Sequence, residues 1–197
     1  MRRFQVLVWL WLAAAGACAS HRNFTPRENQ NGSGPGGQPA AVYAIAVGDA
    51  RGEVRLWSGG SAAVDVDGAA VSELHLGFEI ENTGKQPLHL VPEALQCDEL
   101  WVGEQRLQGL SPVRTAGQPL AAPGTTTRFE AWFRPDLGGP RDIEAFAVRF
   151  RVDGPEGELL TQVTPFSPYL PRGSRYDDPW YWRSGVGFGF YGHYRRW

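Results

Sequence analysis

Between positions 41 and 167, several runs have apolar residues at every second position, the spacing of β-strands with one buried face. The clearest run covers residues 72–81, where apolar residues alternate with polar residues and a glycine. Its apolar members are Leu74, Leu76, Phe78 and Ile80. Similar runs predict further strands at residues 41–47, 53–57, 62–66, 95–102, 127–133 and 146–153. No segment has the period of an amphipathic helix, so the pattern predicts an all-β domain.

The turn residues between these runs predict two hairpins. An Asn-Thr-Gly segment separates residues 72–81 from a run at 85–91. A three-residue loop with Gly84 in the left-handed conformation keeps the apolar residues on one face and pairs Phe78 with Leu88.

The second predicted hairpin follows the run at 146–153. Residues 154–157 read Gly-Pro-Glu-Gly, a composition typical of a tight turn. The strand after this turn is then expected to face the core with Leu159, Thr161 and Val163.

Short strands separated by turns indicate a two-sheet antiparallel sandwich over residues 41–167. The phrase LHLGFEIENTGKQPLHL resembles those of immunoglobulin-like modules in bacterial envelope proteins. This resemblance implies an immunoglobulin-like fold, although the cysteine pair and buried tryptophan of antibody domains are absent. A small closed barrel is the alternative architecture.

The first residues predict export from the cytoplasm. Two arginines precede a charge-free apolar run at residues 6–15. That run has about ten residues, whereas a membrane-spanning helix needs about 20. It therefore has the form of a signal peptide.

Small residues end this segment at Cys18, and Ala-Gly-Ala-Cys resembles the lipobox of bacterial lipoproteins. Ala15 stands where that pattern prefers leucine. The resemblance implies that residues 1–17 are removed and that Cys18 carries the lipid of a membrane anchor. Ala19, in place of aspartate, favours the outer membrane. Secretion without lipid is the alternative.

Composition changes on both sides of the strand region. Residues 18–40 are rich in Gly, Pro, Asn and Gln, which predicts a flexible tether between lipid and domain. Residues 168–197 are rich in aromatics and arginine, and either fold back on the sandwich, stay disordered or bind a partner. An envelope protein, a glycan or the membrane interface would suit them. The partner-binding candidates are Tyr176, Trp180, Tyr181, Trp182, Arg183 and Trp197.

Charge is distributed unevenly along the chain. The net charge of −2 gives no reason to expect nucleic acid as a partner. Residues 40–167 hold 18 acidic and 10 basic residues, a net of −8. Residues 168–197 hold five arginines and two aspartates, a net of +3. The two parts either attract one another or present opposite patches to partners.

Few residues suggest a metal-binding or catalytic site. His75, Glu79 and His89 fall on the polar side of the first predicted hairpin, where they could hold a metal ion or simply face solvent. The segment 65–68, Asp-Val-Asp-Gly, resembles the start of a calcium loop, but a turn between strands explains it better. Cys97 is expected to be a buried structural residue.

The sequence thus predicts a lipid-anchored cell-envelope protein with a non-catalytic sandwich domain that acts as a binding or assembly accessory. No HExxH, GxSxG or CxxC motif is present, so we expect neither enzymatic activity nor a cofactor. A structural surface lipoprotein without a specific ligand is the main alternative. A metal-binding domain is the less favoured one.

Overall fold

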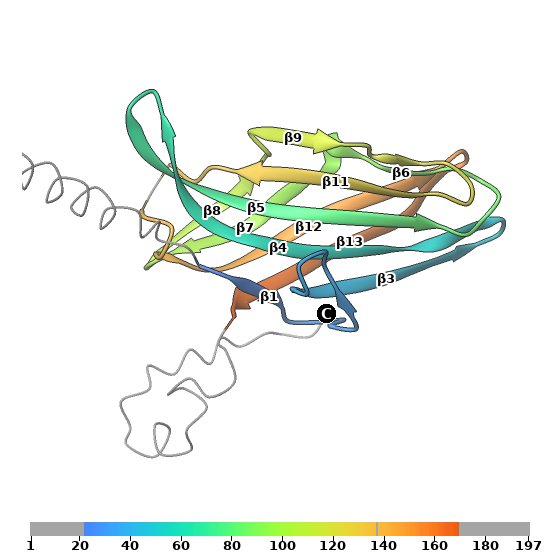
Figure 1. Ribbon diagram of the computed structural model, residues 1–197, viewed down its shortest axis with the longest axis horizontal. Coiled ribbons are helices and arrows are strands. Elements are labelled where there is room, and N and C mark those ends of the chain that lie inside the picture. The colour runs from blue at the N-terminus through green and yellow to red at the C-terminus, as the bar shows by residue number, and fades with distance from the viewer. Residues whose placement is uncertain (1–21, 137, 170–197) are drawn as a thin grey trace, which may run out of the picture.

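A computed structural model describes residues 22–136 and 138–169, which form two stacked antiparallel sheets (Figure 1). Sheet A has six strands in the order β2 (Gly32–Ser33), β3 (Pro39–Val47), β4 (Ala50–Val66), β5 (Ala69–Asn82), β11 (Thr126–Phe133) and β9 (Arg114–Gly117). Sheet B has seven, with β1 (Phe24–Pro26), β13 (Gly157–Pro168), β12 (Ile143–Gly154), β6 (Leu88–Leu90) and β10 (Leu120–Ala121) in order. Its β7 (Gln96–Val102) also pairs with β12, and β8 (Gln105–Leu110) pairs with β7.

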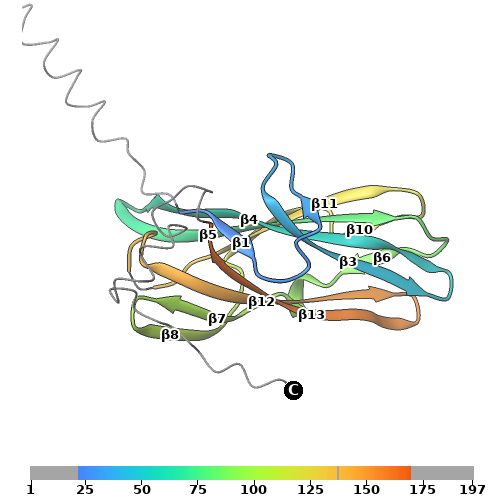
Figure 2. The same cartoon turned by 90° about the horizontal axis from the view of Figure 1, so that it is seen from below.

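The two layers are seen edge-on in Figure 2. They share no strand within the described residues, so the architecture is the predicted sandwich and not a small barrel. A short 3-10 helix, η1 (Pro92–Ala94), separates β6 from β7 along the edge of β12. No helix in the described part of the chain is long and apolar enough to cross a membrane.

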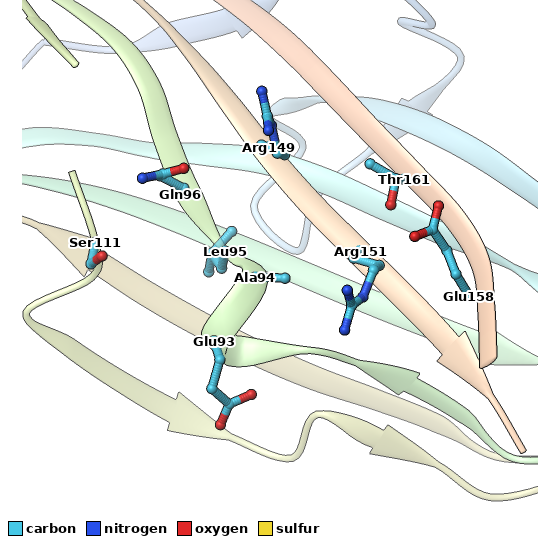
Figure 3. Close-up of a pocket in the computed structure, with 9 residues that line it drawn as sticks. All are labelled: Glu93, Ala94, Leu95, Gln96, Ser111, Arg149, Arg151, Glu158 and Thr161. Carbon is cyan, nitrogen blue, oxygen red and sulfur yellow. The ribbon is translucent and has the colours of Figure 1, made fainter. Parts of the chain in front are cut away.

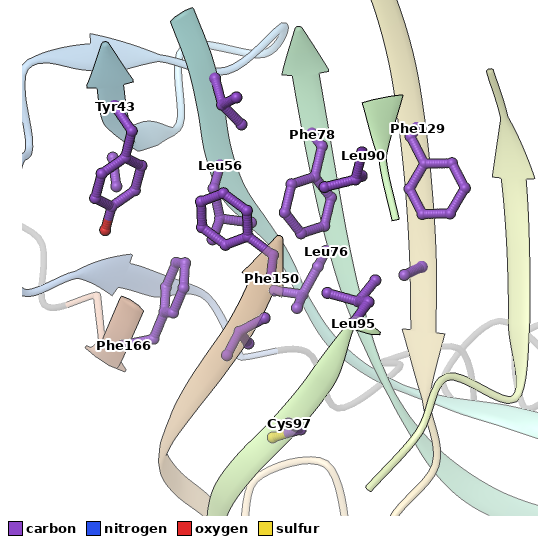
Figure 4. Close-up of a cluster of buried hydrophobic side chains, with 14 of the residues drawn as sticks. Tyr43, Leu56, Leu76, Phe78, Leu90, Leu95, Cys97, Phe129, Phe150 and Phe166 are labelled. Carbon is purple, nitrogen blue, oxygen red and sulfur yellow. The ribbon is translucent and has the colours of Figure 1, made fainter. Parts of the chain in front are cut away.

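The core lies where the inward residues of the two sheets meet (Figure 4). Phe150 of β12 contacts Phe78 of β5 edge to face, with ring centroids 5.6 Å apart. The same ring lies 5.5 Å from that of Tyr43 on β3. The Tyr43 hydroxyl is 2.7 Å from the hydroxyl of Thr164, which gives this buried polar pair a hydrogen bond between the sheets.

The predicted alternation in β5 and β12 is confirmed, because the apolar residues of both strands are almost wholly buried. They are Leu74, Leu76, Phe78 and Ile80 in β5, and Phe146, Val148, Phe150 and Val152 in β12.

The hairpin predicted between residues 72–81 and 85–91 is wrong. After β5 the chain crosses to the other sheet, where β6 pairs with β12 and β10. Phe78 and Leu88 are both buried, but they belong to opposite layers of the sandwich. Gly84 does not have the predicted left-handed backbone; instead it lies so close to the β3–β4 turn that a Cβ would be 2.5 Å from the Arg51 amide nitrogen.

The β12–β13 hairpin is confirmed, with Gly154 paired to Gly157. The inward set predicted after the turn is wrong for Thr161 and Val163, which are exposed, and Leu159 is half-buried. A β-bulge between Val152 and Asp153 shifts the register by one residue. Such a shift reverses the faces of every following residue, so the inward residues are now Thr164 and Phe166.

The flexible tether predicted over residues 18–40 is wrong from Arg22 onward. Strand β1 pairs with the end of β13, and Phe24 is 2% exposed with its ring 5.0 Å from that of Phe146. Strand β2 pairs with β3, and a Cβ on Gly34 would lie 2.8 Å from the ring of Trp57. In this segment, β1 therefore forms an edge strand of sheet B, and the residues around Gly34 cover Trp57 on the outside of sheet A.

The turn predicted at residues 65–68 is confirmed between β4 and β5. Asp67 and Gly68 both have positive φ, 55° and 82°, as a two-residue type I′ hairpin requires. The Asp65 carboxylate accepts a hydrogen bond of 3.0 Å from the Gly68 amide. These aspartates thus serve a turn of the backbone.

Candidate interaction surface

The outer face of sheet B carries a group of apolar residues beside an exposed tryptophan. In the strand register, Trp101 lies opposite Ala145, Ala147 lies opposite Pro165, and Val163 is in the next row. Trp101 is 37% exposed and Val163 is 42% exposed, and the other three are half-buried. We call these five residues the apolar face of sheet B.

Charged residues surround this face. The Arg106 guanidinium lies 5.8 Å from the Trp101 ring and is also ion-paired with Glu99. On the far side, Arg149 donates a hydrogen bond of 2.7 Å to Asp98. An exposed tryptophan beside an arginine is a combination that is enriched in protein–protein contacts.

A shallow depression of about 360 Å³ adjoins the apolar face beyond Arg149 (Figure 3). It lies where η1 interrupts the pairing of β6 and β7 with β12. Its polar lining includes Glu93, Gln96, Arg149, Arg151, Glu158 and Thr161. Arg151 is ion-paired with Asp153 at 3.0 Å, so acidic and basic groups alternate here and no single charge dominates.

The outer face of sheet A differs, because its charged side chains form one connected network. Arg55 donates hydrogen bonds to Glu79 at 2.6 Å and Glu81 at 3.0 Å, and is also ion-paired with Glu53. Arg128 donates to Glu79 at 2.9 Å. Partial burial raises the pKa of Glu79, but the hydrogen bonds from the two arginines outweigh it and hold that pKa below its ordinary value. Glu79 is thus ionised and bound within a salt-bridge network.

Beside this network, three planar groups stack across β9, β11 and β5. The Arg114 guanidinium lies 3.8 Å from the Trp132 ring, and the His75 ring is stacked 4.7 Å from it. Glu73, almost wholly buried, accepts hydrogen bonds from Arg114 at 2.8 Å and Arg134 at 3.1 Å. Trp132 lies between His75 of β5 and Arg114 of β9, and both side chains pack on its ring. It therefore stabilises the sheet and offers no open aromatic surface to a ligand.

The setting of His75 predicts a pH effect on stability. Burial lowers its pKa below the ordinary value of 6.5, and this outweighs the opposing charge of Glu130. The unfolded chain then binds more protons than the folded one, so the unfolding free energy falls as pH drops through about 6.5 and levels off below the folded-state pKa. In urea denaturation between about pH 7.5 and 5.5, His75→Gln is expected to flatten this decline. An equal decline in both proteins would contradict the assignment.

The three metal-ligand candidates are not brought together. His75 and Glu79 lie on β5 in sheet A, whereas His89 lies on β6 in sheet B. Across residues 22–169, with position 137 left out, no group of three His, Cys, Asp or Glu side chains is placed to hold a metal ion.

Cys97 is buried, as predicted, among the core residues. Burial, together with the charge of the neighbouring Asp98 carboxylate, raises the pKa of its thiol to about 12. Its sulfur donates a hydrogen bond of 3.3 Å to the Glu99 carbonyl. The thiol is therefore protonated and inert at neutral pH.

The lipidation candidate Cys18 lies outside the described residues, and so do the aromatic and arginine candidates of the C-terminal segment, Tyr176, Trp180, Tyr181, Trp182, Arg183 and Trp197. Their roles remain predictions from the sequence.

In a regular strand Trp101 would face the core, so its sequence pattern does not mark it as a surface residue. In that pattern Leu95 and Cys97 face the core, and Trp101 would follow them. The register between β12 and β7 shifts by one residue, because Ala147 pairs with Glu99 but the next residue, Val148, pairs with Cys97. The shift turns Trp101 outward, and the sequence carries no clear signal for it.

No protein-family model and no curated protein sequence matches the chain. Among solved structures, it is similar to a crystal structure titled as the "putative ApaA protein" of Bordetella pertussis. The identity is 17%, the match covers 68% of this chain and 98% of that chain, and the TM-score is 0.28. A likeness at this level assigns neither a family nor a function.

Proposed function

We propose that this chain is an exported lipoprotein whose sandwich binds another envelope protein, with no chemistry of its own. The lipobox-like sequence ending at Cys18 supports the anchor. The observation that carries the binding role is the apolar face of sheet B, where Trp101 and Val163 are exposed inside a rim of ion pairs. Aromatic residues and arginine at such a position contribute most of the energy of many protein interfaces.

A structural lipoprotein without a ligand is the competing function. A difference between the two outer faces supports binding. On sheet A, Arg55, Glu79 and Arg128 form one connected network of ion pairs, and the exposed Val47 is the last residue of β3. On sheet B, Trp101 and Val163 are exposed together with the small residues between them. The C-terminal aromatic segment is a second candidate contact for the same partner, since it begins directly after β13.

Site-specific photo-crosslinking in intact cells tests this function. A benzophenone amino acid at Val163 is expected to give one adduct of defined mass, identified by mass spectrometry. The same group at Val47 is the matched control, because Val47 is 53% exposed but lies on sheet A. Adding Trp101→Ala should weaken the interaction by about 2 kcal/mol, roughly thirty-fold in affinity, and reduce the adduct accordingly.

Adducts of the same mass and yield from both positions would contradict a specific surface on sheet B. The absence of any adduct from Val163 in a folded, exported protein would favour the structural lipoprotein instead.

A further inference from the structure

The N-terminal segment joins the folded body only four residues after Cys18. The backbone of Arg22 exchanges two hydrogen bonds with Ser61 of β4, at 3.1 and 2.8 Å. Phe24 then enters the core, and β1 pairs with the end of β13. The Tyr169 amide donates a hydrogen bond of 2.8 Å to the Asn23 carbonyl, so the described chain enters and leaves the sandwich at one place.

That place lies at one end of the sandwich, which we call the entry end (Figures 1 and 2). The β4–β5 turn and the β7–β8 turn lie at this end, together with the segment before β12. The β3–β4 and β12–β13 turns lie at the opposite end.

A two-stranded arm extends from the entry end. It consists of residues 62–73, which pair only with each other within the described chain, since β3 stops pairing at Trp57 and β11 at Leu74. Its sequence is mostly Ala and Val. The base of the arm is fixed by hydrogen bonds from the hydroxyls of Ser61 and Ser72 to the carbonyls of Pro140 and Gly138, at 2.7 and 2.9 Å.

We infer that the sandwich stands directly on the bilayer, with its entry end and the arm against the lipid headgroups. This inference rests on the proposed lipid at Cys18. Four Cα–Cα steps of about 3.8 Å limit the distance from Cys18 to Arg22 to about 15 Å. A tether of residues 18–40 would have allowed about 25 Å on average with no fixed orientation. Because Arg22 is bonded to β4, the short link also determines which end faces the membrane.

Charge does not drive this contact. The exposed acidic residues of the entry end are Asp65, Asp67, Glu104, Asp136, Asp142 and Glu144. The nearby cations are fewer. Arg114 and Arg134 are bound to Glu73 at the base of the arm, and Arg106 lies beside the β7–β8 turn. The Arg22 side chain donates to the carbonyl of Arg141, the fifth cation here, at 2.5 Å. The anchor therefore holds an acidic end at the bilayer, and without the lipid this end has no affinity for zwitterionic headgroups.

Fluorescence quenching in proteoliposomes tests the orientation. The mature lipidated full chain is labelled at Ala69→Cys, in the arm, or at Ala122→Cys, at the opposite end; both alanines are exposed. Cys97 stays unlabelled because it is buried. In phosphatidylcholine vesicles with spin-labelled headgroups, quenching is expected to be several-fold stronger at position 69. About 13 strand residues, roughly 40 Å, separate the two ends.

Two controls separate the possible failures. Inserting twelve Gly/Ser residues after Ser20 adds about 20 Å of reach and should lower quenching at position 69 toward that at 122. Cys18→Ser should leave both labels unquenched. In a chain that mass spectrometry shows to be lipidated, equal quenching at both positions would overturn the orientation but not the anchor. Finding the native chain without lipid would overturn both the anchor and the orientation. Circular dichroism shows whether the labelled variants are folded.

Discussion

Phe150→Ala is expected to lower the unfolding free energy by about 3–5 kcal/mol. The Phe150 ring is fully buried and contacts two rings of the other sheet, Tyr43 at 5.5 Å and Phe78 at 5.6 Å. Its loss opens a cavity between layers that cannot close without moving a whole sheet. Urea denaturation, monitored by tryptophan fluorescence, should show a lower midpoint with an unchanged slope.

Val163→Ala is the matched control for this change. Val163 lies in the row next to Phe150 on the β12–β13 hairpin but faces outward, so its truncation should alter stability by no more than about 0.5 kcal/mol. A loss below about 1 kcal/mol for Phe150→Ala would mean that the two sheets do not pack around this ring.

Much of the strand content follows from the sequence because burial of one face imposes a period of two. Leu74, Leu76, Phe78 and Ile80 had to lie on one side of a strand whichever neighbours that strand took. Turns of fixed chemistry were predictable for the same local reason. Asp67-Gly68 can adopt the two positive φ angles of a tight hairpin, and the structure shows them.

The neighbours of a strand do not follow from its period. Phe78 and Leu88 face the core equally well as partners in a hairpin or as residues of opposite sheets. The crossing is fixed by contacts distant in sequence, because the Thr83 and Gly84 amides both donate to the Arg51 carbonyl. The buried Asn82 side chain then donates to the Ala121 carbonyl at 2.8 Å, which joins the two sheets at this corner.

The candidate site was predictable to a smaller extent. Sequence placed His75 and Glu79 on a polar face correctly, but the metal hypothesis also needed His89 on the same sheet, and that depended on the hairpin. The outward direction of Trp101 could not be predicted, because it depends on a single register shift between β7 and β12. Irregularities of one residue cost little energy locally and leave little trace in composition, yet they decide which side chains reach the surface.

Phe24→Ala is expected to lower the unfolding free energy by about 3 kcal/mol, whereas a flexible tether would make the change silent. Phe24 is 2% exposed, and its ring meets Phe146 edge to face at 5.0 Å. Glu28→Ala is the control in the same segment, because Glu28 is exposed, and it should change stability by less than about 0.5 kcal/mol. Equally small effects of both changes would mean that residues 22–40 are a flexible tether in solution.

A double-mutant cycle with Phe146→Ala strengthens this test, because it isolates the contact between the two rings. An edge-to-face pair contributes about 0.5–1.5 kcal/mol beyond area burial, so the two changes should be less than additive by about that amount. Coupling would show that β1 is held on sheet B in solution by this contact. Phe24 lies six residues after Cys18. Together with the backbone bonds between Arg22 and Ser61, its contact with Phe146 therefore limits how far a lipid at Cys18 would hold the sandwich from the membrane.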